Sequence, residues 1–298
     1  MKPSEFLSSW PAMKKSACLV DYANGINVEY YGDSRQSFAL ASVSKPLTAM
    51  TVLCAAQEEI ISLDDLLPRG FSRSDLLSHQ SGLRFDINGA ISITDCQNAL
   101  GGINESYFQS EPRQRRIYSN LGYEVLAFDL ELKSQMTFRE YLDEALLSPL
   151  QMHDTLLDIT IYPQAGPFGA AAGIRSTNAD IAKLILELID GNLIDDTLKD
   201  RALRPNTPSL DGVLPAYGYF AENSWGLGFE VKGIKSPHWM GTLNSHSAYG
   251  HFGQSGTFLW VDPELRLACC LLTDRPFDKF AKENWPTLSD SIISNRQF

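Results

Sequence analysis

The stretch Phe38-Ala39-Leu40-Ala41-Ser42-Val43-Ser44-Lys45 leads into a predicted helix that follows the first strands of the chain. Pro46 follows and suits a first helical turn, where a proline needs no N–H. Ser42 and Lys45 are three residues apart, so a helix places both side chains on one face. A serine hydroxyl needs a base before it can attack, and a lysine in an apolar cleft loses its proton more easily. By itself, Ser-x-x-Lys also fits a capping serine beside a solvated lysine.

Strand patterns lie before this helix and again near the C-terminal end. Asn24-Gly25 is a strong hairpin signal between an apolar run at 17–22 and an alternating run at 26–31. A further strand is expected at 227–231. A second hairpin turns at Asp262-Pro263-Glu264, and its second arm is apolar on both faces, so we expect that arm in the centre of a sheet.

Between these strand regions the sequence is typical of short helices. One helix is expected over 139–147, and another starts at Ser176-Thr177-Asn178 and ends at Gly191. A last helix is expected from Pro286 to Ser294.

These elements predict an α+β fold, with an antiparallel sheet flanked by helices and a mostly helical second lobe. Residues 1–74 and 165–298 would form the sheet lobe from both chain ends. Residues 75–164 would form the helical lobe, with the active site between the two, because clefts form where lobes meet.

Composition narrows the class of partner. The 298 residues carry a formal net charge of −11, and an acidic surface argues against binding nucleic acid or anionic lipid. The first ten residues lack the pattern of a signal peptide, and no apolar stretch is long enough to span a bilayer. We therefore expect a cytoplasmic protein without membrane contact, or an exported one if a leader preceded these residues. The sequence leaves the oligomeric state open.

Cysteines and histidines do not form a metal or disulfide pattern. An odd number of scattered cysteines fits reduced core thiols: Cys18, Cys54, Cys96, Cys269 and Cys270. There is no Cys-x-x-Cys and no His-Glu-x-x-His, so no metal and no other cofactor is expected. His79 is expected to be structural.

Two further motifs follow Ser42-Val43-Ser44-Lys45 in order: Tyr118-Ser119-Asn120 and His251-Phe252-Gly253. The set resembles the serine β-lactamase-like superfamily, in the branch of class C β-lactamases, D-alanyl-D-alanine carboxypeptidases, D-amino-acid peptidases and related esterases. The pattern of that family is Ser-x-x-Lys, then Tyr-x-Asn, then Lys-Thr-Gly or His-x-Gly. The resemblance extends from about residue 15 to 275, and four more family-like segments support it: 76–83, 148–152, 172–180 and 225–229.

The resemblance implies a role for each matched residue. Ser42 would attack a carbonyl carbon, and Lys45 and Tyr118 would share the roles of general base and general acid, in an order that the sequence leaves open. Asn120 would orient the substrate amide and the lysine.

The third motif would form the opposite wall of the cleft. His251, on an edge strand, would donate to a substrate carboxylate or to the leaving group, and Gly253 would let the substrate approach the strand backbone. The oxyanion hole would combine the backbone N–H groups of Ser42 and Gln254.

Histidine in the third motif departs from the lysine of class C β-lactamases. A mostly neutral histidine suits a β-lactam carboxylate less well than a charged lysine does. We therefore expect a serine hydrolase that forms an acyl-enzyme on Ser42 and acts on a small-molecule ester, amide or D-peptide. It would be an esterase, amidase or D-amino-acid peptidase. The alternatives are a true β-lactamase and a non-catalytic, penicillin-binding-like sensory module.

Overall fold

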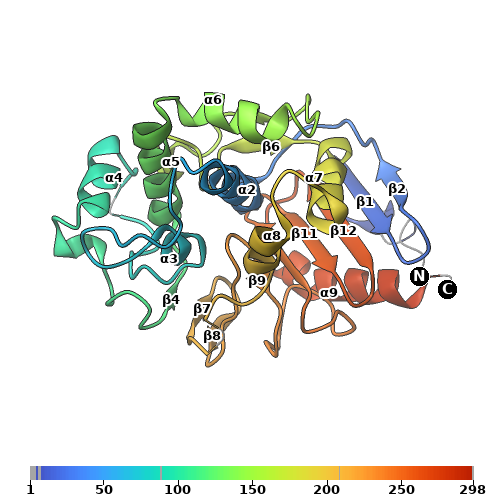
Figure 1. Cartoon of the computed structure of the whole chain (residues 1–298). Helices are drawn as coiled ribbons and strands as arrows, with labels where there is room; N and C mark the ends of the chain where they lie inside the picture. Colours follow the sequence, from blue (N-terminus) through green and yellow to red (C-terminus); the bar gives the residue numbers. More distant parts are fainter. Residues whose placement is uncertain (1–4, 6–7, 88, 208, 297–298) are drawn as a thin grey trace.

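The computed structural model describes residues 5, 8–87, 89–207 and 209–296. Its main sheet has six antiparallel strands in the order β2-β1-β12-β11-β10-β9 (Figure 1). These strands are β1 (Lys15–Asp21), β2 (Asn27–Gly32), β9 (Glu230–Val231), β10 (Tyr249–Gly253), β11 (Thr257–Asp262) and β12 (Leu267–Thr273). The first two come from the start of the chain and the other four from its last third, which confirms the predicted antiparallel sheet built from both ends.

The two predicted hairpins join β1 to β2 and β11 to β12. All residues of β12 are buried, and this strand lies between β1 and β11, as its apolar pattern predicts. Successive side chains of a strand point to opposite faces. Cys269 and Cys270 accordingly belong to two different hydrophobic clusters, one on each face of the sheet.

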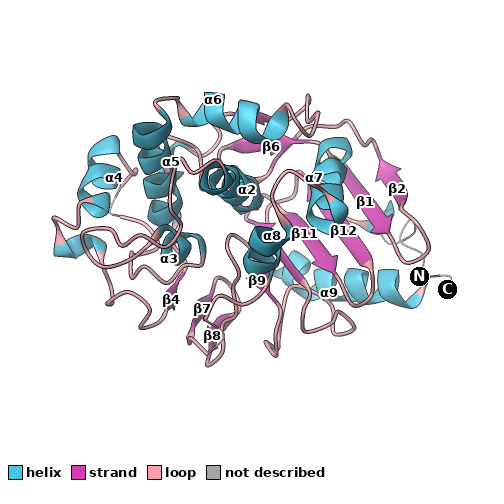
Figure 2. Ribbon diagram, viewed as in Figure 1, coloured by secondary structure: helices cyan, strands magenta, loops and turns pink. Residues whose placement is uncertain are grey.

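Helices cover both faces of the main sheet, and others gather beside it (Figure 2). Helix α7 packs against β1 and β12, while α9 contributes Trp285 and Leu288 to the cluster on the other face. Helices α3, α4 and α5 lie together at the left of the view, with α2 between them and the sheet. The helices are α2 (Ser44–Gln57), α3 (Arg73–Leu77), α4 (Ile93–Leu100), α5 (Asn120–Ser134), α6 (Phe138–Leu142), α7 (Asn178–Asp190), α8 (Asp196–Leu203) and α9 (Lys279–Ser294).

The described residues also form two small three-stranded sheets. One holds β3 (Phe38–Ala39), β6 (Ile174–Ser176) and β5 (Leu156–Leu157), and the other holds β4 (Arg116–Ile117), β7 (Gly212–Leu214) and β8 (Gly218–Phe220). Strand β5 comes from the predicted helical lobe, yet it pairs with β6 of the predicted sheet lobe. The lobe boundaries at 74/75 and 164/165 stay a prediction.

Three predicted elements differ in extent. The strand expected at 227–231 is only β9, because Gly228 turns the chain with a φ of +95°. The last helix begins at Lys279, where Asp278 caps it, and Pro286 lies inside the helix. The helix expected over 139–147 ends at Leu142 and continues as a π-helical turn.

Helix α2 is buried along almost all of its length rather than on one face, from Ser44 through Ala55. A helix that is hydrophobic all round belongs in the interior of a protein. This central position explains how α2 can present a functional side chain to a cleft while its remaining surface packs in the core.

Within the described ranges, no helix is long and apolar enough to cross a bilayer. The same residues contain no cluster of three or more His, Cys, Asp or Glu that could hold a metal ion. All five cysteines are buried and free of disulfides, as the sequence predicts.

Candidate active site

Ser42 lies on a tight turn between strand β3 and helix α2. The preceding residue, Ala41, has a φ of +47°, a left-handed conformation that is unusual for a residue other than glycine. Ser42 then forms a short 3₁₀ turn, Ala41–Val43, that continues into α2. Its neighbours on both sides are buried, whereas Ser42 itself is partly exposed. The turn therefore lifts one serine hydroxyl out of the core into a cleft.

Lys45 lies one helical turn further along, completely buried beneath Ser42. Its Nζ is 3.4 Å from Ser42 Oγ and donates to Asn120 Oδ1 at 2.7 Å and to the carbonyl of Ala171 at 2.9 Å. Burial lowers the pKa of Lys45 to about 7, although the carboxylates of Glu124 and Asp86 oppose this shift. Lys45 is therefore a fixed amine that can exist in its neutral form near neutral pH.

Tyr118 and Asn120 reach the cleft from the junction of β4 and α5. Ser119 caps α5 by accepting from the N–H of Gly122, which fixes the chain on both sides of the cap. His79 accepts from the N–H of Ser119 through Nδ1, and its ring packs in a tilted arrangement against Tyr118 with the centroids 4.5 Å apart. This is a structural position. Burial raises the pKa of Tyr118, while its hydrogen bond with Ser42 acts in the opposite direction. The phenol therefore keeps its proton at neutral pH.

His251 faces Tyr118 from strand β10, and β9 pairs only with the two residues before it. His251 Nδ1 is 2.8 Å from the carbonyl of Phe252, which can only accept, so Nδ1 carries the proton. Burial lowers the pKa of His251 to about 3, so the ring is neutral and Nε2 is an acceptor, 3.5 Å from the Tyr118 hydroxyl. The expected donation from His251 to a substrate carboxylate does not fit this tautomer.

Gly253 and Gln254 follow His251 at the end of β10. A Cβ at Gly253 would lie 2.3 Å from the carbonyl oxygen of Leu40 and 2.6 Å from Thr257 Oγ1. Glycine is thus required here because the chain just before the Ser42 turn, Ala41–Val43, approaches closely, and this space is not open to a substrate. Among the described residues, no hydrogen bond occupies the backbone N–H of Ser42 or Gln254. Both groups are free for an oxyanion, and their role stays a prediction.

Most of the predicted residues border one cleft of about 270 Å³. Ser42, Tyr118, Asn120, His251 and Gln254 line it. Lys45 lies behind Ser42 and Asn120, and Gly253 supports the wall. The remaining lining is largely aromatic and apolar: Ala41, Phe85, Tyr162, Ala165, Ala172, Leu214, Pro215, Trp225 and Phe252, with Asp86 and Gln164 as further polar residues.

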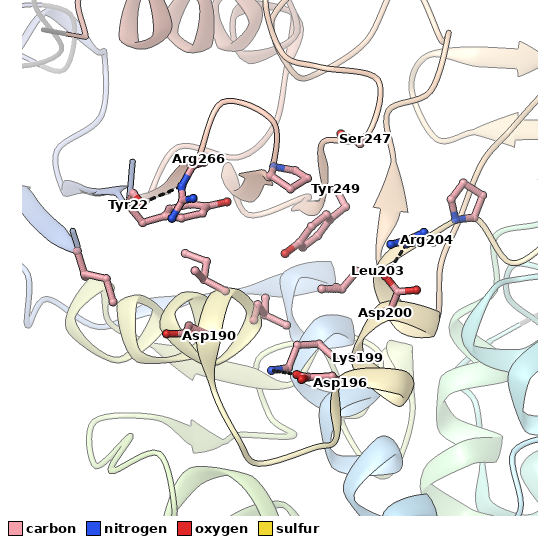
Figure 3. Close-up of a pocket in the computed structure, with 15 residues that line it drawn as sticks. Tyr22, Asp190, Asp196, Lys199, Asp200, Leu203, Arg204, Ser247, Tyr249 and Arg266 are labelled. Atoms are coloured by element: carbon pink, nitrogen blue, oxygen red, sulfur yellow. Dashed lines mark hydrogen bonds and ion pairs between the residues drawn. The ribbon is translucent and has the colours of Figure 1, made fainter. Parts of the chain in front are cut away.

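A larger cleft of about 1080 Å³ lies between α7, α8 and the β11–β12 turn (Figure 3). None of the predicted site residues lines it. Its basic side chains already have partners: Arg266 donates to the carbonyl of Tyr22, and Lys199 lies 3.7 Å from Asp196. The close-up marks both pairs with dashed lines. The smaller cleft is therefore the one that brings Ser42 together with Lys45 and the other predicted site residues.

Two acidic residues at the site escaped the sequence analysis. Asp86 accepts from Asn120 Nδ2 at 2.9 Å and lines the cleft. Glu124 is fully buried and accepts from the N–H groups of Phe168 and Ala171. It thereby holds the loop whose Ala171 carbonyl accepts from Lys45. Burial raises the pKa of Glu124 to about 7. An acid within the apolar pattern of helix α5 was the only sequence signal for it.

A third acid, Glu230, is buried and supports the strand that carries His251. It pairs with Gly250 of β10 and accepts from Lys235 at 2.9 Å, His238 at 2.8 Å and Trp239 at 2.6 Å. Burial would raise the pKa of Glu230, but Lys235 and His238 outweigh it and lower the pKa to about 2. This carboxylate therefore stays ionised inside the core.

Comparison with known proteins agrees with this architecture. The beta-lactamase family model matches residues 19–290. A crystal structure of a beta-lactamase from Mycobacterium bovis has 38% sequence identity and a TM-score of 0.86, with 98% of each chain covered. The octameric penicillin-binding protein homologue from Pyrococcus abyssi shares the fold at a TM-score of 0.70 and 16% identity, covering 98% of this chain and 76% of that one.

Among curated proteins, a putative D-alanyl-D-alanine carboxypeptidase from Escherichia coli O157:H7 is 23% identical over 260 residues. That match covers 70% of this chain, which spans 58% of the length of the relative. The family match and the Mycobacterium bovis structure both extend over most of the chain. This chain belongs to the beta-lactamase family, within the serine hydrolase superfamily that includes the penicillin-binding proteins.

Proposed function

We propose that the chain is a serine esterase, amidase or D-amino-acid peptidase that forms an acyl-enzyme on Ser42. The observation that carries this proposal is the buried amine of Lys45, 3.4 Å from Ser42 Oγ and with a pKa of about 7. A base with a pKa near the working pH is partly deprotonated and can still drive proton transfer. A solvated lysine would be almost fully charged and could not act in this way.

The environments of Lys45 and Tyr118 support an order for their roles. The pKa of Lys45 is lowered and that of Tyr118 is raised, in both cases mainly by burial. The neutral amine is then the better first base, and the neutral phenol is the better proton donor. Two titratable groups whose environments push their pKa values apart commonly divide acid and base duty in this way.

The proposed acylation conserves every proton. Ser42 Oγ attacks the substrate carbonyl carbon while its proton passes to Lys45 Nζ, and the oxyanion accepts from the N–H groups of Ser42 and Gln254. Tyr118 then protonates the leaving oxygen or nitrogen and recovers a proton from Lys45 as the bond to the carbonyl carbon breaks. Deacylation repeats these roles. Water loses a proton to Lys45 as it attacks the acyl carbon, Tyr118 protonates the departing Ser42 Oγ, and Lys45 returns a proton to Tyr118.

The shape of the cleft supports a small acyl group. Its volume of about 270 Å³ lies just below the usual range for small-molecule sites, and most of its lining is apolar. The matched relatives named D-alanyl-D-alanine carboxypeptidases make a peptide substrate a reasonable member of the tested set.

A β-lactamase is the second candidate, because the 38% identical structure from Mycobacterium bovis is named a beta-lactamase. His251 argues against it. A neutral ring with an accepting Nε2 offers no charge to the carboxylate of a β-lactam. Nitrocefin turnover as fast as ester turnover would favour this second candidate.

The test is hydrolysis of p-nitrophenyl butyrate by the wild type, Ser42→Ala and a control, Ser106→Ala. Ser106 is exposed and lies outside the cleft. We expect Ser42→Ala to lose at least about 1,000-fold in kcat, since removal of a nucleophile leaves only binding and the oxyanion hole. Ser106→Ala should match the wild type. Equal rates for all three proteins would refute the proposal.

A further inference from the structure

Asp86 places a carboxylate in the cleft that the proposed chemistry does not use. Its Oδ1 accepts from Asn120 Nδ2, whose amide oxygen in turn accepts from Lys45. Within the described chain, no hydrogen bond or ion pair involves Asp86 Oδ2. The side chain is only partly buried and lines the cleft. One carboxylate oxygen is thus fixed by the site, and the other is available to a ligand.

Aromatic surface surrounds this carboxylate. Phe85, the neighbouring residue, is 45% exposed and stacks on Tyr118 with the ring centroids 5.7 Å apart. Tyr162 and Trp225 line the same cleft. An organic cation is attracted both by a carboxylate and by the faces of aromatic rings.

No opposite charge is present to receive an anionic substrate. None of the described residues that line the cleft is lysine or arginine. His251 presents an acceptor, and the amine of Lys45 lies behind Asn120 and the Ala171 carbonyl. A carboxylate in the substrate would therefore meet Asp86 without a compensating cation.

We infer that Asp86 selects substrates with a free ammonium group on the acyl side, such as esters or amides of amino acids with an unblocked amine. This inference rests on the proposed function. With Tyr118 protonating the leaving group beside His251, the acyl group extends along Asn120 toward Asp86. There the ammonium meets the free oxygen of Asp86 and the exposed ring of Phe85.

Three matched methyl esters test this inference at pH 7: alanine, N-acetylalanine and N-succinylalanine, each as the D and the L form. They carry a cationic, a neutral and an anionic acyl group, and chromatography measures the released acid. We expect kcat/KM for the alanine ester of the preferred hand to exceed that of the acetylated ester by on the order of tenfold, the size of one charge-assisted hydrogen bond. The succinylated ester should be the poorest.

Asp86→Asn should bring the ratio of cationic to neutral kcat/KM close to one, and Asp86→Lys should reverse it in favour of the succinylated ester. The control is Asp65→Asn, which removes the same charge from an exposed residue outside the cleft and should keep the wild-type ratio. A ratio is insensitive to a general loss of active protein.

Two outcomes would overturn the inference. One is a wild type without preference among the three esters, and the other is a preference that Asp86→Asn retains. Both comparisons use only the part of the hydrolysis rate that is lost in Ser42→Ala. A failure of the inference thus differs from a failure of the proposed function, in which Ser42→Ala has no effect at all.

Discussion

In the proposed mechanism, the charge state of Lys45 controls when Ser42 can react. The neutral amine would accept the serine proton, and the charged form could not. With a pKa of about 7, the neutral fraction rises as the pH rises through that value. His251 adds no second step near 6.5, because burial lowers its pKa to about 3. In the proposed mechanism, protonation of Lys45 therefore removes the base on the acidic side, in the same pH range in which the nearby Glu124 gains its proton.

We predict that kcat/KM for p-nitrophenyl butyrate rises with pH with a midpoint near about 7 and falls about tenfold per pH unit below about 6. Lys45→Arg, whose side chain stays protonated, should lose about 100- to 10,000-fold across the whole range. A flat profile between about pH 6 and 8 in the wild type would show that Lys45 is not the base.

At this scale the sequence motifs located Ser42, Lys45, Tyr118 and Asn120, because each belongs to a pattern with fixed local spacing. Asp86 and Glu124 were missed for a physical reason. Asp86 acts on a residue 34 positions away, and Glu124 on loop groups 44 and 47 positions away. No local pattern encodes such contacts. The tautomer of His251 was equally invisible, since it depends on a backbone carbonyl.

Among the secondary-structure elements, β10 packs closely at Gly253 against Leu40 and the turn Ala41–Val43, which carries Ser42. We predict that Gly253→Ala destabilises the protein by about 1–3 kcal/mol, because its Cβ would overlap the Leu40 carbonyl, which cannot move without moving Ser42. Esterase activity should fall with it. Urea unfolding, monitored by circular dichroism, measures the free energy of unfolding of the variant and the wild type.

Gly122→Ala is the matched control for Gly253→Ala. Gly122 lies in helix α5, and its added Cβ would meet only atoms at 3.5 Å, an ordinary contact distance. Alanine has the higher helix propensity, so stability should stay equal or rise by up to about 1 kcal/mol. If Gly253→Ala were as stable as the wild type, β10 would not pack as tightly on Leu40 and the Ala41–Val43 turn as the structure shows.

Glu230 links β9 to the segment that contains Lys235, His238 and Trp239. Its pKa is about 2 in the folded protein against 4.5 in an unfolded chain. The stabilisation is therefore complete above about pH 4.5 and is lost as the pH falls toward about 2. We predict that Glu230→Gln lowers the free energy of unfolding by about 3 kcal/mol at neutral pH, because it leaves a buried cation unpaired.

Urea unfolding at neutral pH and at about pH 3 separates the effect of the charge from that of packing. The difference in the free energy of unfolding between Glu230→Gln and the wild type should shrink at about pH 3. Glu222→Gln is the control, because Glu222 is exposed and should show no change at either pH. A difference that is constant with pH would mean that Glu230 stabilises the fold by shape alone.

Element boundaries were harder to predict than element types. Proline inside α9 led to a predicted start at Pro286, yet the Asp278 cap begins the helix at Lys279. The apolar run at 227–231 is typical of a strand, but Gly228 turns the backbone beside Ala49. In both cases a contact or a cap outweighed the local pattern.

At the scale of the whole molecule, strand patterns at both chain ends were sufficient to predict one antiparallel sheet with helices around it. The doubly apolar β12 was correctly placed in its interior. The cleft between α7, α8 and the β11–β12 turn was not foreseen, because its walls come from segments far apart in the sequence. The arrangement also explains why α2 can carry Ser42 and Lys45, since the sheet and the surrounding helices bury it on nearly every side.

The nucleophile is tested most directly by the intact mass of the protein after incubation with a fluorophosphonate, followed by peptide mapping. We predict one adduct per chain, located on Ser42, absent from Ser42→Ala and formed more slowly in Lys45→Arg. The five cysteines are buried and should stay unmodified. If the folded wild type formed no adduct, or formed one on another residue such as Ser44, Ser42 would not be the nucleophile.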